Sequence, residues 1–530
     1  MNDRDKALLE IKEKLVALEE PTREILNQVK RNTSKKYKLK NFPKNSEILA
    51  ICDDEERQLL LPILMKRIVR TLSGVAIVAM MTQPWPCPHG KCIMCPGGPD
   101  NERPQSYTGF EPTTLRGIRN DYDPYKQAEE RVKQLNAIGH STEKIDAIIM
   151  GGTFTNQTLD YQKWFILRMF DAFNGVDSKT IQEAHKINET AKNRCVGLTA
   201  ETRPDEINHK KIDHLLDYGV TRIEVGVQTV FDDVYEKMQR GHTTQDTKSA
   251  FQFIRDSGLK LTAHMMPGLP GSSFERDIEA FDILFNSSDY RPDEIKIYPT
   301  MVIPGTKLHE DYVAGRYSAL TNESTAKLIA KVKELVPPYV RIKRVLRDIP
   351  AHQIVAGPNK SDLRLDILSL LEKEGKKCRC IRCREVGHYV YKSGQDISSA
   401  DIELVQRTYD ASKGKEHFLS FEDTLNDVII GFLRLRELSN DIIRPEFKEQ
   451  STIVVRELHV YGELIGLRSI HKRDLQWQHR GYGKELLARA EEIGQELDYS
   501  KISVISGIGV REYYRKLVYL LDGPYMSKSL

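Results

Sequence analysis

The sequence has no long hydrophobic segment. Its densest apolar run, Leu59–Met65, is seven residues long and contains Pro62, whereas a membrane-spanning helix needs about 20 apolar residues. The first residues, Met-Asn-Asp-Arg-Asp-Lys, carry no apolar core of the kind found in signal peptides. These absences predict a soluble, cytoplasmic protein with no membrane partner.

The net charge is also small. It is +3 over 530 residues, of which 40% are hydrophobic and 29% are charged. Such a chain has enough apolar material for three or four domains of about 100 to 200 residues each. The composition therefore excludes wholesale disorder and a disulfide-stapled miniprotein.

Positive charge is concentrated in two stretches that lack acidic residues. Seven Lys or Arg residues lie between Lys30 and Lys44, and five lie between Lys376 and Arg384. Either stretch alone is typical of a solvated protein face. Together they favour a polyanion such as RNA, for which Tyr37 and Phe42 could supply stacking groups.

Cysteine is sparse, and its eight copies are unevenly placed. Cys52 and Cys195 stand alone and are interpreted as small buried hydrophobic residues. The other six form two groups of three: Cys87, Cys92 and Cys95, and then Cys378, Cys380 and Cys383. Because cytosolic thiols stay reduced, each group indicates a metal site rather than disulfides.

Between residues 71 and 348, short β-branched runs alternate with longer amphipathic stretches. This alternation predicts an α/β unit of six parallel strands with helical crossovers. The expected strands are Val75–Thr82, Asp146–Met150, Cys195–Ala200, Arg222–Val227, Leu259–Met265 and Glu294–Tyr298. A basic strand, Tyr339–Arg347, is expected to follow them and close the domain.

Most of these strands end in small, polar or Pro/Gly residues. In barrel-like α/β folds, ligands bind at the carboxyl ends of the strands. The candidates for ligand binding at these ends are Gly151, Gly152, Thr153, Glu201 and Gln228.

Three other segments surround this unit. Residues 1–70 are charged and predicted to be helical, and residues 349–397 form a connector rich in Gly, Cys and Arg. Residues 398–530 change to consecutive strands followed by a helix, a strand and a second helix, which predicts an α+β domain.

The first cysteine group lies in Cys87-Pro-His-Gly-Lys-Cys92-Ile-Met-Cys95-Pro-Gly-Gly, directly after the first predicted strand. With His89 the three thiolates would complete a tetrahedral zinc site. Alone they suit a 4Fe-4S cluster in which one iron stays open to a small molecule. The local spacing leaves both alternatives open.

The context of this loop favours iron and sulfur. A three-cysteine loop after the first strand, with Gly151-Gly152-Thr153 ending the second, resembles the radical S-adenosylmethionine (SAM) superfamily. The spacing is C-x4-C-x2-C rather than that superfamily's usual C-x3-C-x2-C. The resemblance implies that the three cysteines hold a 4Fe-4S cluster and that SAM binds the open iron and the strand-end candidates. Cleavage of SAM would then give a 5′-deoxyadenosyl radical.

Longer segments resemble one family across nearly the whole chain. They are Ser73-Gly-Val-Ala-Ile-Val-Ala-Met-Met, Cys87-Pro-His, Cys95-Pro-Gly-Gly-Pro-Asp, Gln105-Ser-Tyr-Thr-Gly-Phe-Glu-Pro and His264-Met-Met-Pro. This family is the catalytic subunit of Elongator, in its single-chain archaeal form. The resemblance implies a tRNA-modifying acyltransferase that uses acetyl-CoA and a SAM-derived radical to install a carboxymethyl-type group at carbon 5 of the wobble uridine. It leaves open whether accessory subunits or a second copy take part.

The last domain contains a Gly-rich loop that opens a helix, Gln478-His-Arg480-Gly481-Tyr-Gly483-Lys484. Backbone N–H groups at such a turn can bind a pyrophosphate. With Tyr513 and Tyr514 on a later helix, this loop resembles a GNAT acetyltransferase, which implies acetyl-CoA. The tyrosines could instead be core residues, but neighbours lie about 100° apart on a helix, so at least one should be available.

The Elongator resemblance places acetyl-CoA contacts on individual positions. They are Lys144, Glu457, Leu458, His459, Val460, Tyr482, Gly483, Lys484 and Tyr514, to which the loop itself adds Gln478, Arg480 and Gly481. Tyr514, with its neighbour Tyr513, is the candidate for positioning the thioester or protonating the departing thiolate. Lys144 is the candidate for holding the cofactor from the barrel side, and His459 could equally be an ordinary strand histidine.

The second cysteine group, Cys378-Arg-Cys380-Ile-Arg-Cys383, predicts a zinc site with His388 as a possible fourth ligand. The alternative is loop cysteines in a basic tract. A metal suits this connector because it has few apolar residues with which to hold two domains together.

The predicted organisation has four parts. Residues 1–70 form a basic helical tRNA-binding extension, 71–348 a partial (β/α)6 TIM-type radical SAM barrel, 349–397 a zinc connector and 398–530 a GNAT-type acetyltransferase domain. The expected partner is tRNA, bound through its anticodon stem-loop. Two other functions remain: a protein lysine acetyltransferase with a structural iron–sulfur domain, and a non-catalytic RNA-binding scaffold.

Overall fold

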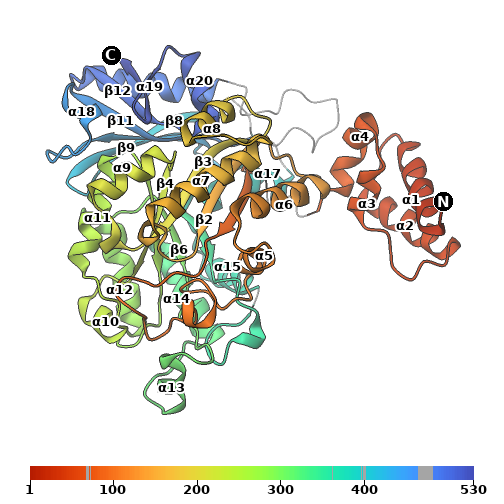
Figure 1. Cartoon of the computed structure of the whole chain (residues 1–530), viewed down its shortest axis with the longest axis horizontal. Helices are drawn as coiled ribbons and strands as arrows, with labels where there is room; N and C mark the ends of the chain where they lie inside the picture. The colour runs from red at the N-terminus through yellow and green to blue at the C-terminus, as the bar shows by residue number, and fades with distance from the viewer. Residues whose placement is uncertain (67–70, 72, 361, 395–396, 398–400, 463–480) are drawn as a thin grey trace.

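The computed structural model contains a helical unit, a barrel-like α/β unit and a second, mixed β-sheet (Figure 1). It describes residues 1–530 except 67–70, 72, 361, 395–396, 398–400 and 463–480. Across this described part of the chain, no helix is long and apolar enough to cross a lipid bilayer.

The N-terminal residues form four helices, as predicted. They are α1 (Asp3–Val16), α2 (Arg23–Lys36), α3 (Asn45–Ala50) and α4 (Asp54–Leu64). Their apolar side chains, among them Ile11, Leu15 and Leu60, form a small core of their own. Figure 1 shows these helices as a separate group to one side of the barrel. Arg57 links the group to the barrel by donating to the backbone oxygen of Asn136 at 2.8 Å.

The barrel-like unit is a parallel sheet whose strands follow the order of the sequence. Its strands are β1 (Ala76–Met81), β2 (Lys144–Met150), β3 (Arg194–Thr202), β4 (Arg222–Gln228), β5 (Lys260–Met265), β6 (Glu294–Ile297) and β7 (Arg341–Val345). The predicted α/β partial barrel is confirmed, but the sheet has seven strands rather than six. The basic segment expected to close the domain is itself the seventh strand and pairs with β6. Its Lys343 side chain forms an ion pair with Glu294 at 3.2 Å.

Helices cover the outside of this sheet (Figure 1). They are α5 (Pro112–Arg119), α6 (Pro124–Ala137), α7 (Leu159–Asn174), α8 (Ile181–Asn188), α9 (His209–Asp217), α10 (Asp232–Lys237), α11 (Thr244–Asp256), α12 (Phe274–Asn286) and α14 (Asn322–Leu335), whereas α13 (Lys307–Val313) projects away from the sheet. The connector contributes α15 (Leu363–Lys373), α16 (Ile381–Arg384) and α17 (Val386–Ser393). A continuous apolar core joins the sheet, the helices, the connector and the second sheet.

The second sheet is mostly antiparallel and has the order β13-β14-β12-β11-β10-β9-β8. Its strands are β8 (Ile402–Ala411), β9 (Gly414–Asp423), β10 (Val428–Glu437), β11 (Thr452–Val460), β12 (Lys501–Ile505), β13 (Leu520–Asp522) and β14 (Tyr525–Ser529). Its helices are α18 (Pro445–Lys448), α19 (Tyr482–Glu496) and α20 (Arg511–Arg515). Sequence reasoning missed β8, an edge strand that alternates exposed with partly buried side chains along most of its length, and the short strands β13 and β14.

The second sheet packs on the amino ends of the barrel strands. Gly507 lies against the backbone of Val196, where any side chain would collide. Nearby, Arg456 donates to Asp293, just before β6, at 2.6 and 2.9 Å and to Glu416 at 3.0 Å. The two sheets are therefore joined by direct backbone packing and by buried ion pairs.

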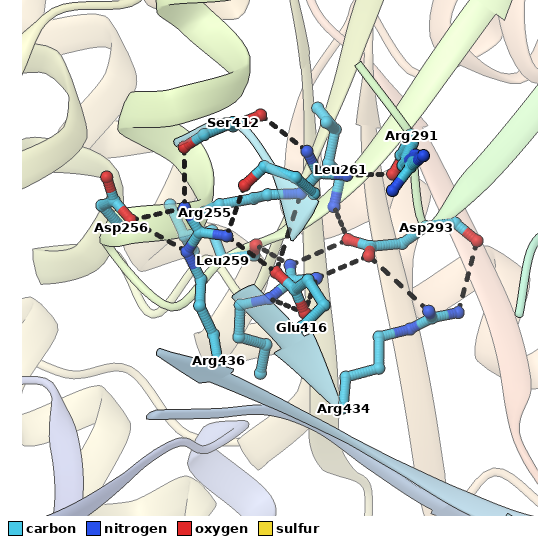
Figure 2. Close-up of polar contacts among 12 residues, drawn as sticks. Arg255, Asp256, Leu259, Leu261, Arg291, Asp293, Ser412, Glu416, Arg434 and Arg436 are labelled. Atoms are coloured by element: carbon cyan, nitrogen blue, oxygen red, sulfur yellow. Dashed lines mark hydrogen bonds and ion pairs between the residues drawn. The ribbon is translucent and has the colours of Figure 1, made fainter. Parts of the chain in front are cut away.

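These ion pairs form one buried network, part of which Figure 2 shows. Its members are four guanidinium groups and four carboxylates: Arg255, Arg434, Arg436 and Arg456 with Asp256, Asp293, Glu416 and Glu457. Arg436 and Arg456 are 0% exposed. Because the charges are matched in number, the barrel and the second sheet can bury them together.

Candidate functional site

A cavity opens at the carboxyl ends of the barrel strands, the end opposite the second sheet. It has a volume of about 120 Å³. Among its lining residues are Cys87, Gly152, Thr153, Glu201 and Gln228. A second, more apolar cavity, lined by Cys92, Cys95 and several methionines, shares Gln228, Arg240 and Arg347 with it.

The loop after β1 holds its three thiols among hydrogen-bond donors. Cys92 Sγ lies 3.2 Å from His89 Nε2 and accepts from Arg240 Nη1 at 3.7 Å. Cys95 Sγ accepts from the backbone N–H of Ser106 at 3.2 Å. Burial raises the pKa of the Cys95 thiol, so a thiolate there requires a positive partner such as a metal ion. Three thiolates with surrounding donors are a donor set that fits an iron–sulfur cluster.

The strand-end candidates lie beside these thiols. Thr153 Oγ1 lies 3.6 Å from Cys87 Sγ. Glu201 accepts a hydrogen bond from Tyr107 Oη at 2.7 Å and from the N–H of Gly151 at 3.3 Å. Gly151 itself packs against Thr82 rather than lining the cavity. The fold thus gathers four of the five candidates at one cavity and places the fifth directly behind it.

Gln228 combines two features of a ligand-binding residue. Its φ of 74° lies in the left-handed region, which non-glycine residues rarely adopt. Its Oε1 atom is buried and has no hydrogen-bond partner among the described residues. Backbone strain and an unsatisfied amide at a cavity are both typical of functional sites.

Sequence reasoning missed the charged side chains inside the barrel. Glu224 contacts Lys296 and lies 3.0 Å from His264 Nε2. Arg222 donates to Asp146 at 2.6 and 2.7 Å. A signal was present, because charged residues alternate with β-branched ones in Arg222-Ile-Glu224 and Glu294-Ile-Lys296, a pattern that points alternate side chains to one face of a strand.

The second sheet contains a gap between neighbouring strands. β11 pairs with β12 only over Thr452–Val455 but continues beside β10 as far as Val460, so β11 and β12 separate after Val455. An added Cβ on Gly483, in the first turn of α19, would lie 3.6 Å from Val460 Cγ2 and 3.2 Å from Tyr513 Oη. The end of β11, the start of α19 and helix α20 therefore meet around a space that a side chain would fill.

The predicted acetyl-CoA contacts divide between two faces of β11. Glu457 faces the barrel, where it accepts from Arg434 at 3.0 Å and from Lys260 at 3.3 Å, and His459 stacks near Phe432 and Tyr461 on the same face. Leu458 and Val460, by strand alternation, face the other way. Any contact of Glu457 or His459 with a cofactor at the gap would therefore use their backbone groups.

The other predicted acetyl-CoA contacts, on α19 and α20, differ in exposure and in packing. Tyr482 packs its ring on Phe421, Lys484 is exposed and Gly481 has a φ of 93° at the start of α19. Tyr514 is 6% exposed, and its ring centroid lies 5.2 Å from that of Tyr513. The hydroxyl group near Gly483 is that of Tyr513. Gln478 and Arg480 lie outside the described residues.

Lys144 begins β2 at the amino end of the barrel. It lies in register with Arg194, and Arg194 packs against Gly509, two residues before α20. The fold therefore brings this residue to the same end of the barrel as the second sheet.

The connector cysteines form a compact group. The sulfur atoms of Cys378, Cys380 and Cys383 lie within 4.8 Å of one another. Hydrogen bonds from the other two sulfurs lower the pKa of Cys383, and Lys333 lies 3.7 Å from its sulfur. This geometry can hold one metal ion. His388, on α17, does not belong to the group of ligand atoms that meet there.

The two basic stretches have different surroundings. In the first, Lys35, Lys38, Lys40 and Phe42 are exposed. The second stretch, taken together with the basic strand from Arg341 that precedes it, is exposed only in part. Three of its basic residues are buried or half-buried with acidic partners: Arg341 with Glu385, Lys343 with Glu294, and Arg384 with Glu422 and Asp427. Exposed positive charge in the connector lies instead on residues such as Lys377 and Arg379.

Three family models match this chain. They are the radical SAM superfamily over residues 86–284, the radical SAM C-terminal domain over 292–375 and the ELP3 N-terminal domain over 4–72. These matches cover the barrel with its cysteine loop, the following segment and the helical unit.

Related proteins match nearly the whole length. The tRNA uridine(34) acetyltransferase of Methanocaldococcus jannaschii is 50% identical, with 92% of this chain and 90% of that protein aligned. Elongator complex protein 3 of Schizosaccharomyces pombe is 44% identical, with 99% and 98% aligned. The solved structure of Methanocaldococcus infernus Elp3 with an N-terminal deletion (1–46) has a TM-score of 0.77 at 44% identity and covers 86% of this chain and 100% of that one.

Proposed function

Because this chain belongs to the family of the tRNA uridine(34) acetyltransferases and Elongator complex protein 3, we propose that it is a radical SAM enzyme that modifies the wobble uridine of tRNA in the cytoplasm. The finer proposal is that acetyl-CoA and SAM together install a carboxymethyl-type group at carbon 5 of that base. Accessory subunits are not required by this proposal.

The cavity at the carboxyl ends of the strands carries the proposal. Cys87, Cys92 and Cys95 would hold a 4Fe-4S cluster, and Gly152, Thr153, Glu201 and Gln228 would bind SAM beside it. When bound there, the cluster and SAM supply a 5′-deoxyadenosyl radical. The chain's own residues orient SAM through the unsatisfied amide of Gln228 and the Glu201 carboxylate, and the enclosing walls keep water from the radical.

The radical accounts for the choice of reactants. Carbon 5 of uridine is a weak nucleophile and the methyl group of a thioester is a poor electrophile, so an ionic route is slow. If the acetyl methyl group loses a hydrogen atom, the carbon radical can add to carbon 5, and hydrolysis of the thioester leaves a carboxymethyl group. The two proposed sites lie at opposite ends of the barrel, so the acetyl group must move from one to the other during the reaction.

Anaerobic reconstitution tests this function. Protein loaded with iron and sulfide is incubated with tRNA, SAM, acetyl-CoA and a reductant, and the nucleosides are analysed by mass spectrometry. We expect 5′-deoxyadenosine and a carboxymethylated uridine, both dependent on SAM. Acetylation of a peptide amine without SAM would favour the lysine acetyltransferase, and tRNA binding with no SAM cleavage would favour the scaffold.

The gap between β11 and β12 is the proposed acetyl-CoA site. Backbone groups of 457–460 would contact the pantetheine arm, the first turn of α19 would bind the pyrophosphate, and Tyr513 or Tyr514 would lie near the thioester. Lys144 would approach from the barrel side. The space beside Gly483 supports this assignment, since a Cβ there would fill it.

Replacing Gly483 by Val should therefore weaken acetyl-CoA binding at least tenfold, because the side chain would occupy the space between Val460 and Tyr513. Isothermal titration calorimetry with acetyl-CoA measures the change, and SAM cleavage serves as a check that the barrel is intact. Gly483→Ala, which adds only the Cβ, is the graded comparison and should weaken binding less than Gly483→Val. An unchanged affinity for acetyl-CoA in Gly483→Val would show that the cofactor binds at another site.

The compact connector cysteines are the proposed zinc site. A single Zn²⁺ binds thiolates at about 2.3 Å, which the spacing within 4.8 Å permits. Cys380→Ser should lose one equivalent of zinc and retain its iron, as measured by mass spectrometry of metals. The unfolding temperature should fall, because the metal stabilises α16 and its contact with β7. Loss of iron instead of zinc would identify an iron–sulfur site.

The exposed face of the N-terminal unit is the proposed contact for tRNA phosphates. Replacing Lys35, Lys38 and Lys40 by Gln should weaken tRNA binding and make its dependence on the logarithm of salt concentration shallower by about 2. Fluorescence anisotropy at several salt concentrations measures both effects. The matched control neutralises Lys307, Lys327 and Lys331, on α13 and α14, and should leave the slope unchanged. Equal salt dependence in the wild type, the Lys35/Lys38/Lys40 variant and the control would show that this face does not bind tRNA phosphates.

A further inference from the structure

His264 lies at the carboxyl end of β5 and lines the cavity that contains Glu201 and Cys87. Its Nε2 atom lies 3.0 Å from Glu224 Oε2. Its ring meets Tyr298 edge-on, with ring centroids 5.4 Å apart. No described residue makes a hydrogen bond to its Nδ1 atom, so this nitrogen is left for a molecule in the cavity.

Glu224 is a fixed anion behind this ring. Burial would raise the pKa of its carboxyl group, but Lys296 and Lys343 outweigh that effect and hold the pKa well below its ordinary value. Lys343 lies 3.5 Å from Oε1. Glu201, Glu224 and His264 come close enough to bind a metal ion, but the ammonium group of Lys296 already pairs with Glu224.

A carboxylate that holds one ring nitrogen fixes the tautomer and orientation of a histidine and leaves the other nitrogen as a base. Burial lowers the pKa of His264 below its ordinary value, so the ring is neutral and able to accept a proton near neutral pH. The arrangement has the form of a general base with its positioning residue.

Hydrogen-atom transfer needs no such base, but the completion of the product does. After a carbon radical adds to carbon 5 of uracil, that carbon still carries its hydrogen and carbon 6 carries the unpaired electron. To restore the C5–C6 double bond, the adduct must lose one proton and one electron. The C5–H bond is acidic, because it lies next to the C4 carbonyl group and to the radical centre.

We propose that His264 is the catalytic base that removes the proton from carbon 5 of the uracil adduct, with Glu224 as its positioning residue. This rests on the proposed function. The C5–H bond breaks, its proton moves to Nδ1, and its electron pair joins the unpaired electron in the C5–C6 π system. One electron then leaves to a one-electron oxidant of the oxidised iron–sulfur class, and the proton passes to solvent.

The test compares His264→Gln, His264→Ala and the wild type under the anaerobic conditions described above. The matched control is His185→Gln, because His185 is also a buried histidine, packed on Phe170 at 4.6 Å between ring centroids and remote from the cavity. The reactions are followed by 5′-deoxyadenosine and by modified nucleoside. tRNA whose wobble uridine carries deuterium at carbon 5 is used in parallel.

The His264 variants should form modified nucleoside about 10²- to 10⁴-fold more slowly, while SAM cleavage stays within a fewfold of the wild type. Deuterium at carbon 5 should slow the variants more than the wild type, and added imidazole should partly restore His264→Ala. Product formation at the wild-type rate would overturn the assignment, as would a parallel loss of 5′-deoxyadenosine without imidazole rescue. If the wild type forms no modified uridine, the proposed function itself fails.

Discussion

Replacing Cys92 by Ser is expected to abolish SAM cleavage and the modification of tRNA. Cys92 is buried, and its sulfur accepts a hydrogen bond from Arg240 Nη1 at 3.7 Å. A serine hydroxyl does not ionise near neutral pH and is a poor ligand for iron, so the proposed cluster would lose one of its three protein ligands. Iron content, the visible absorption of the cluster and 5′-deoxyadenosine formation measure the effect, and all three should fall to background.

Two comparisons make this result specific. Cys195→Ser changes a buried cysteine whose thiol donates to the Gly197 backbone oxygen at 3.4 Å, a bond that a hydroxyl can also make, so iron content and activity should survive. tRNA affinity should survive in Cys92→Ser as well, because the exposed lysines lie on another unit. If Cys92→Ser keeps four irons per chain and cleaves SAM, the cluster does not depend on this thiol and the site must be reassigned.

Arg456→Met should destabilise the protein by about 3 to 5 kcal/mol. The side chain is 0% exposed and holds both Asp293 and Glu416 at the junction of the barrel and the second sheet. Methionine has a similar length but no charge, so two carboxylates would stay buried with one fewer cation. Urea denaturation followed by circular dichroism measures the free energy of unfolding of the joined unit.

The matched control removes an exposed arginine. Arg276→Met breaks the pair with Asp233, whose side chains are 34% and 52% exposed, and should cost no more than about 1 kcal/mol. Equal effects of the two substitutions would show that the network of Figure 2 does not join the two sheets.

The same network predicts sensitivity to acid. Burial alone would raise the pKa of Asp293, but Arg456 and Arg434 hold it below its ordinary value. An ionised Asp293 therefore contributes stability above the unfolded pKa of about 3.9, and this contribution is lost as the pH falls through the lower, folded value. In Arg456→Met the folded pKa of Asp293 should rise toward the unfolded value, so the acid-dependent loss should be smaller and should be complete at a higher pH. A series of urea titrations between neutral and acidic pH would detect this difference.

The sequence by itself determined the order of the units and the position of the first cysteine loop. Repeated strands joined by helical crossovers are typical of a parallel sheet, and the carboxyl ends of parallel strands lie at one edge. For this reason Glu201 and Gln228, 27 positions apart in the printed sequence, could be assigned to one site with Cys87. The spacing of the connector cysteines likewise predicted a compact group.

Only the tertiary structure decided which charges are inside. Arg384 belongs to a basic stretch of the sequence, yet it is buried beside Glu422 from a distant segment. A sequence shows the charge of a residue but not its partner, and burial of an arginine depends on that partner being fixed in place. For the same reason the pairing of His264 with Glu224, 40 residues apart, and the packing of the second sheet on the amino ends of the barrel became visible only in three dimensions.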